Sequence, residues 1–228
     1  MKVLIACEES QAICKAMRDN GHEAYSCDIR ECSGGHPEWH IKGDCLEVIN
    51  GNTGFFTQDG EGHIIEGKWD LLIAHPPCTY LSNAGNQCFS PKLYSDQQIA
   101  HRMEQRIEGM QFFLTFVKAD CDKIAIENPI GVMNTAFRKP DQIIDPWMFA
   151  ESENDEENYV TKKTCLWTKG LPHLVGNPDI KPKVNSERYA NGKRKNWTEA
   201  FNRDPVKRSK TFPGIARAIA DQWAPKGA

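Results

Sequence analysis

The sequence predicts an α/β fold built on a mostly parallel sheet with flanking helices. Short apolar segments alternate with amphipathic segments over the first 128 residues, which is the β-α-β order of such folds. The apolar segments are continuous rather than alternating, as expected for strands that are covered on both faces. A chain of 228 residues is long enough for one such domain with a full core.

Four segments of this region have the composition of buried strands. Residues 2–7, 23–29, 69–75 and 123–127 are short and apolar, and we expect each to form a strand. Two other segments have apolar residues at helical spacing. The first expected helix spans residues 9–20 and is closed by Gly21. The second spans residues 95–119, and its expected inner side consists of Ile99, Met103, Ile107, Met110, Phe113, Leu114 and Val117.

Beyond residue 135 the pattern becomes irregular, because prolines interrupt it repeatedly. Residues 163–168 are compatible with one more strand, and residues 213–223 predict a final helix with Pro213 in its first turn. We therefore divide the chain into an α/β core at 1–135, a small irregular region at 136–210 and a C-terminal helix at 211–228 that packs on the core.

Composition excludes several classes of protein. Hydrophobic content of 39% and charged content of 26% are ordinary for a soluble protein. The apolar run at residues 69–74 is far too short to cross a bilayer, and the first residues turn acidic too soon for a signal peptide. The nine cysteines form no regular disulfide framework, which fits a reducing compartment. We expect a soluble, cytoplasmic protein that is monomeric and has no membrane contact.

The net charge of −3 conceals a local asymmetry. Residues 181–210 carry ten Lys/Arg and three Asp/Glu, whereas residues 1–180 carry sixteen and twenty-seven. Lys193, Arg194 and Lys195 lie near Trp197 and Phe201 in this basic block, and cations mixed with aromatic residues are typical of nucleic-acid grooves. A basic block beside an acidic body indicates a local contact with a polyanion. The alternative is an ordinary solvated loop.

Two of the predicted strands end in residues that can carry chemistry. One runs into Pro76, Pro77 and Cys78, and the other ends in Glu127 followed by Asn128. The carboxyl ends of parallel strands open on one edge of a sheet, so the thiol and the carboxyl group are expected to face one cleft. The two prolines restrict the backbone that presents Cys78.

A thiol and a carboxyl group in one cleft suit a reaction on cytosine. A thiolate that adds to C6 makes C5 nucleophilic, and an acid near N3 neutralises the charge that develops on the ring. Cys78 and Glu127 are therefore the candidate catalytic residues. The alternatives are a structural thiol for Cys78 and a helix-capping or lysine-paired carboxylate for Glu127.

In their order and spacing, these motifs resemble the DNA (cytosine-5) methyltransferase family. Residues 70–78 (DLLIAHPPC) resemble its nucleophile motif, residues 125–129 (AIENP) its glutamate motif, and residues 43–45 (GDC) its turn against the cofactor adenine. The resemblance covers residues 1–135. It implies a Rossmann-like S-adenosylmethionine-dependent methyltransferase fold, S-adenosylmethionine as cofactor, and methyl transfer to C5 of cytosine in DNA. A target base within a duplex must then be flipped out of the stack.

The same resemblance implies ligand contacts for individual residues. It makes residues 1–135 the cofactor-binding and catalytic core, and residues 136–210 the substrate-recognition region. The implied cofactor contacts are Ala6, Cys7, Glu8, Ser10, Asp28, Ile29, Asp44, Cys45 and Pro76. The implied substrate contacts are Pro77, Asn128, Lys162 and Lys163, and the basic block adds Lys193, Arg194 and Lys195.

Three departures from the family pattern keep other functions open. The loop after the first strand lacks the family's glycines, Lys162 or Lys163 stands in for an absent Gln-x-Arg-x-Arg element, and the recognition region is short. Alternatives are the same chemistry on a free cytidine nucleotide or an RNA, transfer of a group other than methyl, or a catalytically silent relative that binds nucleic acid. The spacing of Cys27, Cys32, His36 and His40 is compatible with zinc, but these residues lack a CxxC or HxxxH frame, and we expect no metal.

Overall fold

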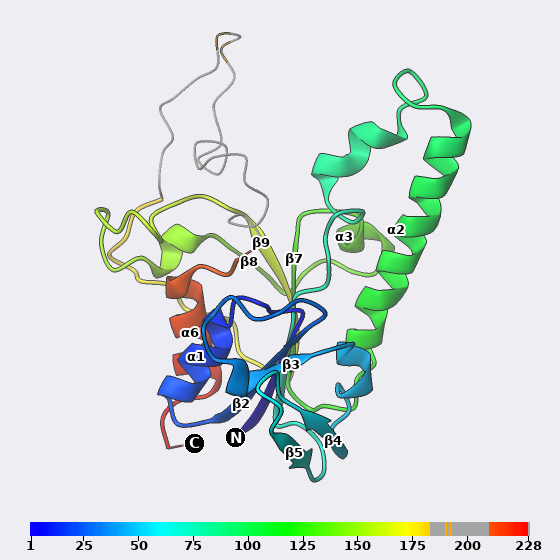
Figure 1. Cartoon of the computed structure of the whole chain (residues 1–228). Helices are drawn as coiled ribbons and strands as arrows, with labels where there is room; N and C mark the ends of the chain where they lie inside the picture. Colours follow the sequence, from blue (N-terminus) through cyan, green and yellow to red (C-terminus); the bar gives the residue numbers. More distant parts are fainter. Residues whose placement is uncertain (183–189, 191, 193–209, 228) are drawn as a thin grey trace.

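The computed structural model describes residues 1–182, 190, 192 and 210–227. These residues form an α/β structure around a seven-stranded mixed sheet with the order β3-β2-β1-β6-β7-β9-β8 (Figure 1). Neighbouring strands from β3 to β7 pair in parallel, and β9 pairs antiparallel with both β7 and β8. The architecture is compatible with the predicted Rossmann-like fold. The strands of this sheet are β1 (Lys2–Ala6), β2 (Glu23–Asp28), β3 (His40–Lys42), β6 (Leu71–Ala74), β7 (Ile124–Pro129), β8 (Gln142–Ile144) and β9 (Thr164–Lys169).

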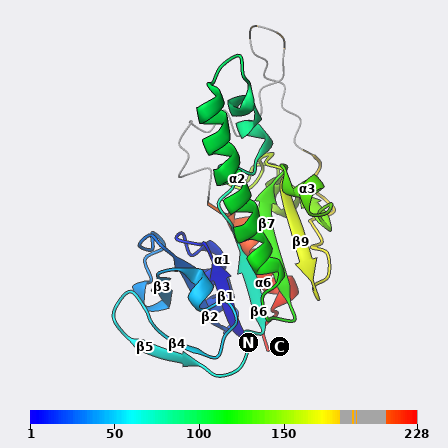
Figure 2. The same cartoon turned by 90° about the vertical axis from the view of Figure 1, so that its right-hand side faces the viewer.

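Helices cover both faces of the sheet. α1 (Ala12–Asp19) and α6 (Pro213–Trp223) lie on one face, and α2 (Asp96–Val117) lies on the other (Figures 1 and 2). Alternation along β1 shows how the layers form, because Val3 and Ile5 belong to the core cluster of α1 and α6, whereas Leu4 belongs to that of α2. Shorter helical segments are α3 (Met133–Ala136), η1 (Pro37–Trp39), η2 (Cys45–Glu47), η3 (Asn83–Phe89) and η4 (Pro146–Phe149).

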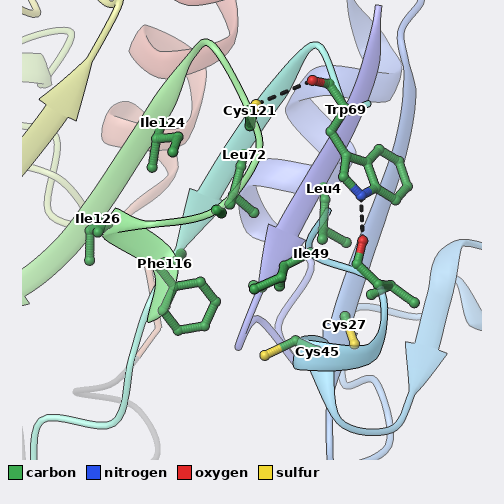
Figure 3. Packing of buried hydrophobic residues seen from close by; sticks show 14 of the residues in the cluster. Leu4, Cys27, Cys45, Ile49, Trp69, Leu72, Phe116, Cys121, Ile124 and Ile126 are labelled. Atoms are coloured by element: carbon green, nitrogen blue, oxygen red, sulfur yellow. Dashed lines mark hydrogen bonds between the residues drawn. The ribbon is translucent and has the colours of Figure 1, made fainter. Parts of the chain in front are cut away.

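The core beneath α2 explains where β6 begins. Trp69 is buried, its indole Nε1 donates to the Val48 carbonyl oxygen at 2.6 Å, and its own carbonyl oxygen accepts from the Cys121 thiol at 3.2 Å (Figure 3). These contacts tie Trp69 to neighbouring loops. The strand itself begins at Leu71, two residues later than the sequence predicts.

Two expected features of the helices were wrong. The first helix begins at Ala12 rather than residue 9, because Gln11 takes a left-handed conformation with φ of 58° that ends the preceding loop. In α2, Ser95 caps the first turn in a capping box with Gln98. Met103 and Ile107 are 44% and 48% exposed, so they do not face the core as predicted. They lie in the half of α2 that extends beyond the edge of the sheet (Figure 1).

Four strands were not predicted: β3, β8 and the hairpin of β4 (Thr53–Phe56) and β5 (Gly62–Ile65). β3 and β8 have only three residues each, too few to show a period. The hairpin did carry a signal, since Asp59-Gly60 lies between two short β-prone segments and Gly60 has a φ of 93°. β8 and β9 complete the main sheet, so the sheet crosses the proposed boundary at residue 135.

The strand order indicates where a ligand is expected to bind. The chain passes outward from β1 to β2 and β3, and then crosses to β6 on the other side of β1. Such a reversal opens a crevice at the carboxyl ends of the strands, where ligands bind in open α/β sheets. The residues that follow β1 and β6 lie at this crevice.

Within the described residues, no helix combines the length and apolar composition that crossing a membrane requires.

Candidate active site

The site begins with two neighbouring strand ends. β6 and β7 pair in parallel with Ala74 opposite Ile126, so the next residues in register are His75 and Glu127. Their side chains meet, and His75 Nδ1 lies 2.9 Å from Glu127 Oε2. Both side chains are mostly buried, with 13% and 22% of their surfaces exposed. The register of the sheet thus makes a cross-strand pair of ionisable groups at the crevice.

The loops that follow these strands are fastened to each other. Asn128 is buried, and its side-chain amide donates to the Pro76 carbonyl oxygen at 2.7 Å. Further along, Ser82 and Gly131 form a β-bridge, and the Val132 amide donates to the Leu81 carbonyl oxygen at 2.8 Å. Both predicted motifs therefore belong to one connected corner of the structure.

Cys78 lies on the surface of this corner. Its side chain is exposed, and its carbonyl oxygen accepts from the Leu81 and Ser82 amides at 3.1 and 3.0 Å. The preceding Pro76 is buried and Pro77 is exposed, so the chain emerges from the core just before the thiol. All nine cysteines are described, and none forms a disulfide. Cys78 differs from the buried thiols in the exposure that a nucleophile requires.

Arginines of α2 hold the next part of the Cys78 loop. Arg106 Nε donates to the Tyr80 carbonyl oxygen at 2.8 Å, and its guanidinium lies 3.9 Å from the ring centre of Phe89. Arg102 lies 5.1 Å from the ring centre of Tyr80. The half of α2 that extends beyond the sheet thus supports the loop that carries the thiol.

The charges of the His75–Glu127 pair reinforce each other. Burial alone would lower the pKa of His75, but the hydrogen bond and charge of Glu127, together with the charge of Glu8, raise it above its usual value. Burial alone would raise the pKa of Glu127, but the hydrogen bond from His75 and the charge of Lys162 hold it below its usual value. Each residue of the pair therefore favours the charged form of the other.

The two predicted lysines lie in different surroundings. Lys162 is half-buried and lines a cavity of about 20 Å³ together with His75 and Glu127. Lys163 is exposed, and its charge acts on Asp145. Lys162 is therefore the lysine that the structure brings to the pair. The predicted contacts Lys193, Arg194 and Lys195 lie outside the described residues.

The loop after β1 makes its turn without glycine. Cys7 has a φ of 60°, and its amide donates to the Cys27 carbonyl oxygen at 2.7 Å. Glu8 is buried, and its carboxylate accepts from the Ile13 and Cys14 amides at 2.7 and 3.2 Å. Glu8 thus holds the start of α1 with both of its carboxylate oxygens. Ala6 is buried in the sheet, and Ser10 is half-buried in the loop.

Two carboxylates follow β2 and β3. Asp28 Oδ1 accepts from the Arg30 amide at 2.9 Å, and Asp44 Oδ1 accepts from the Leu46 amide at 2.9 Å. These contacts are local Asx turns, which shape each loop. Between the two loops, the Ile29 side chain is 76% exposed. Cys45 is buried, with its sulfur 3.8 Å from that of Cys7, so the three predicted cofactor segments lie next to one another.

The two histidines weighed as zinc ligands, His36 and His40, serve other contacts. The ring nitrogens of His40 lie 2.9 Å from the Ser26 hydroxyl and 2.9 Å from the Arg30 carbonyl oxygen, and the His36 ring stacks on Trp39. In the part of the chain that the structure describes, no group of three His, Cys, Asp or Glu side chains is arranged to hold a metal.

Comparison with known proteins adds no assignment. No protein-family model and no curated protein matches this chain. Fold and site geometry therefore carry the functional argument.

The sequence predicted no role for His75, although the residue lies within the segment that resembles the nucleophile motif. A signal was present, because His75 stands two residues after the buried Ile73 and continues the same face of β6. What the sequence lacked was the register of β6 against β7, which puts His75 beside Glu127.

Proposed function

We propose that the chain transfers a methyl group from S-adenosylmethionine to C5 of cytosine in DNA, through a covalent adduct between Cys78 and C6. The observation that carries this proposal is the bond from the Asn128 side chain to the Pro76 carbonyl oxygen. It joins the residue after Glu127 to the residue two before Cys78. An exposed thiol and a carboxyl group thus share one braced corner, as covalent attack with acid assistance requires.

In this proposal each residue has a separate task. The Cys78 thiolate adds to C6, and the ring electrons make C5 nucleophilic. Glu127 delivers a proton to N3 as that bond forms, which neutralises the ring. Asn128 and Pro76 hold the two loops at a constant separation, and Lys162 adds positive charge beside the carboxylate.

The residues beside the crevice fit S-adenosylmethionine by their chemistry. Asp28 and Asp44 offer carboxylates for the hydroxyl and amino groups of an adenosine. The exposed Ile29 offers an apolar surface for a purine ring. The bound cofactor would supply an electrophilic methyl group for C5. Pro76, which is buried beside the crevice, would form part of the wall toward Cys78.

DNA is the proposed substrate because of the distribution of charge. The block at residues 181–210 has a large excess of cations, while residues 1–180 have an excess of carboxylates. A polyanion bound through that one segment would be repelled by the rest of the surface, which favours a local contact over general coating. Phosphate contacts of this kind make affinity fall with salt.

The decisive experiment measures transfer of a tritiated methyl group to duplex DNA, single-stranded DNA, RNA and dCMP side by side. We expect incorporation into DNA by the wild type and none by Cys78→Ala, since no other group replaces the thiolate. Cys88→Ala is the matched control, because Cys88 is a half-buried thiol of η3 outside the site, and it should retain activity. Duplex DNA with 5-fluorocytosine should trap the wild type covalently.

Other outcomes of the same experiment would replace parts of the proposal. Near-normal turnover by Cys78→Ala would refute the covalent mechanism. Methylation of RNA or dCMP with none of DNA would change the substrate. Cofactor binding without incorporation into any substrate would identify a silent relative.

A further inference from the structure

The proposed chemistry leaves a gap at Glu127. The residue must deliver a proton to N3, yet His75 and Lys162 hold its pKa below the usual value, so near neutral pH it is a carboxylate with no proton to give. A second group must therefore supply that proton. The candidate must touch the carboxylate and carry a proton at neutral pH.

His75 meets the first condition by its position, and the charges of Glu127 and Glu8 favour the second because they raise the pKa of its imidazole. Its Nδ1 lies 2.9 Å from Glu127 Oε2, on the side of the carboxylate that faces β6. Its backbone amide donates to the Ala6 carbonyl oxygen at 2.9 Å, which anchors the residue to β1. The other ring nitrogen, Nε2, is buried and has no hydrogen-bond partner within the described residues. A buried polar atom without a partner is unusual, and a catalytic role is one reason for it.

We propose, on the basis of the cytosine chemistry above, that His75 is the proton source that recharges Glu127. The Nδ1–H bond of the imidazolium breaks as an O–H bond forms on the Glu127 carboxylate. The resulting carboxylic acid gives its proton to N3 while the Cys78 sulfur bonds to C6. In this step the charge of the attacking thiolate and that of the imidazolium cancel. After methyl transfer a water molecule takes the C5 proton as the C6–S bond breaks, and the N3 proton returns to Glu127 and then to His75.

The neighbouring charges are compatible with this role. Glu8, in the loop after β1, favours the charged imidazole, and Lys162, before β9, opposes it. Among the described residues of α6 and of the segment just before it, the cavity beside the pair is lined by the uncharged side chains of Thr211, Phe212 and Ile215. The cavity of about 20 Å³ beside the pair has room for about one water molecule.

A purely structural histidine would have a different signature. If His75 only oriented Glu127, a neutral donor at the same place would suffice. His75→Asn provides that donor, because the amide nitrogen of Asn occupies nearly the place of Nδ1 but does not titrate near neutral pH. His75 acts through Glu127, so it is a positioning residue in either case, and pH dependence separates the two roles.

The kinetic test is the pH profile of kcat/KM for methyl transfer by the wild type and His75→Asn. In the wild type, activity should fall as pH rises through the raised pKa of His75. In His75→Asn the proton must come from Glu127 alone, so this falling limb should move to lower pH, with a rate loss of roughly 10²-fold or more at pH 8 that shrinks in acid. His101→Asn, an exposed histidine of α2, should keep the wild-type profile. Equal profiles for the wild type and His75→Asn would overturn the relay alone.

A second measurement is independent of turnover. Titration of ¹⁵N-labelled histidines in the cofactor-free protein should give His75 a pKa above the usual value of about 6.5. Glu127→Gln should lower that pKa, because the amide carries no charge. A neutral His75 at pH 6 in the wild type would overturn the relay even if the protein methylates DNA. A wild type that acts on no form of cytosine would refute the proposed function and the relay with it.

Discussion

Ionisable side chains are used differently at the two ends of the crevice. Where β6 and β7 end, His75 and Glu127 bond to each other across strands, with Lys162 beside them. Where β2 and β3 end, Asp28 and Asp44 bond to amides of their own turns. Cross-strand pairing couples the protonation of one residue to that of another, whereas an Asx turn only shapes its loop. The first end is suited to moving protons and the second to holding a ligand.

The largest effect that tests this contrast is expected at Glu127. Glu127→Gln keeps an oxygen that accepts from His75 but has no proton to deliver, so methyl transfer should fall by roughly 10²- to 10⁴-fold. Cofactor affinity, measured by calorimetry, should stay the same. An unchanged rate would make Glu127 structural, and a parallel loss of cofactor affinity would show that the two ends are not separate.

A smaller effect is expected where β2 and β3 end, and there it should fall on cofactor affinity rather than on the rate. Asp28→Ala and Asp44→Ala should each weaken S-adenosylmethionine binding by about 1–3 kcal/mol, which is about 5- to 150-fold, with little change in the rate at saturating cofactor.

The structure also supplies the control for these variants. Alanine removes the turn contact as well as any ligand contact, whereas Asp28→Asn and Asp44→Asn keep an oxygen that can accept from the turn amide. If the asparagine variants bind as tightly as the wild type, the carboxylate charge has no part in cofactor binding. If DNA affinity falls together with cofactor affinity, the variants have disturbed the fold.

The sequence predicted most of the parallel sheet because its strands are buried on both faces. Continuous apolar segments marked β1, β2, β6 and β7, and the last helix has the predicted bounds of Pro213–Trp223. The limits of these elements depend on tertiary contacts instead. Trp69 lies before the strand, where its indole donates to the Val48 carbonyl oxygen, and Met103 is exposed because its half of α2 extends beyond the sheet.

The candidate site was predictable in its parts but not in its pairing. Strand ends with Cys78 and Glu127 were visible in the sequence, and the structure braces their loops through Asn128. The partner of Glu127 was not visible, since His75 is 52 residues away and only strand register brings it near. The role of Glu8 was also hidden, because its carboxylate bonds amides of α1 five and six residues later.

Glu8 lies between the two ends and provides the finest test of their separation. Burial raises its pKa, although the charge of His75 and the Ile13 and Cys14 amides favour the charged form. An unfolded carboxyl group ionises at lower pH than this folded one, so the wild type should lose stability as pH rises through the folded pKa of Glu8. Glu8→Gln does not ionise and should not share that loss.

The measurement is the difference in unfolding free energy between Glu8→Gln and the wild type from pH 4 to pH 8. Glutamine keeps one acceptor for the α1 amides and loses the second, which adds an offset that is the same at every pH. The informative quantity is therefore the slope of this difference against pH. The variant should gain stability relative to the wild type with rising pH, and each kcal/mol gained raises Tm by about 2–4 °C.

Because the charge of Glu8 favours the protonated His75, the alkaline fall in activity should also occur at slightly lower pH in the variant. A stability difference independent of pH, or one that shrinks as pH rises, would mean that Glu8 is stably ionised by the helix. Glu8 would then resemble Asp28 and Asp44, whose carboxylates bond to nearby amides, and not the His75–Glu127 pair.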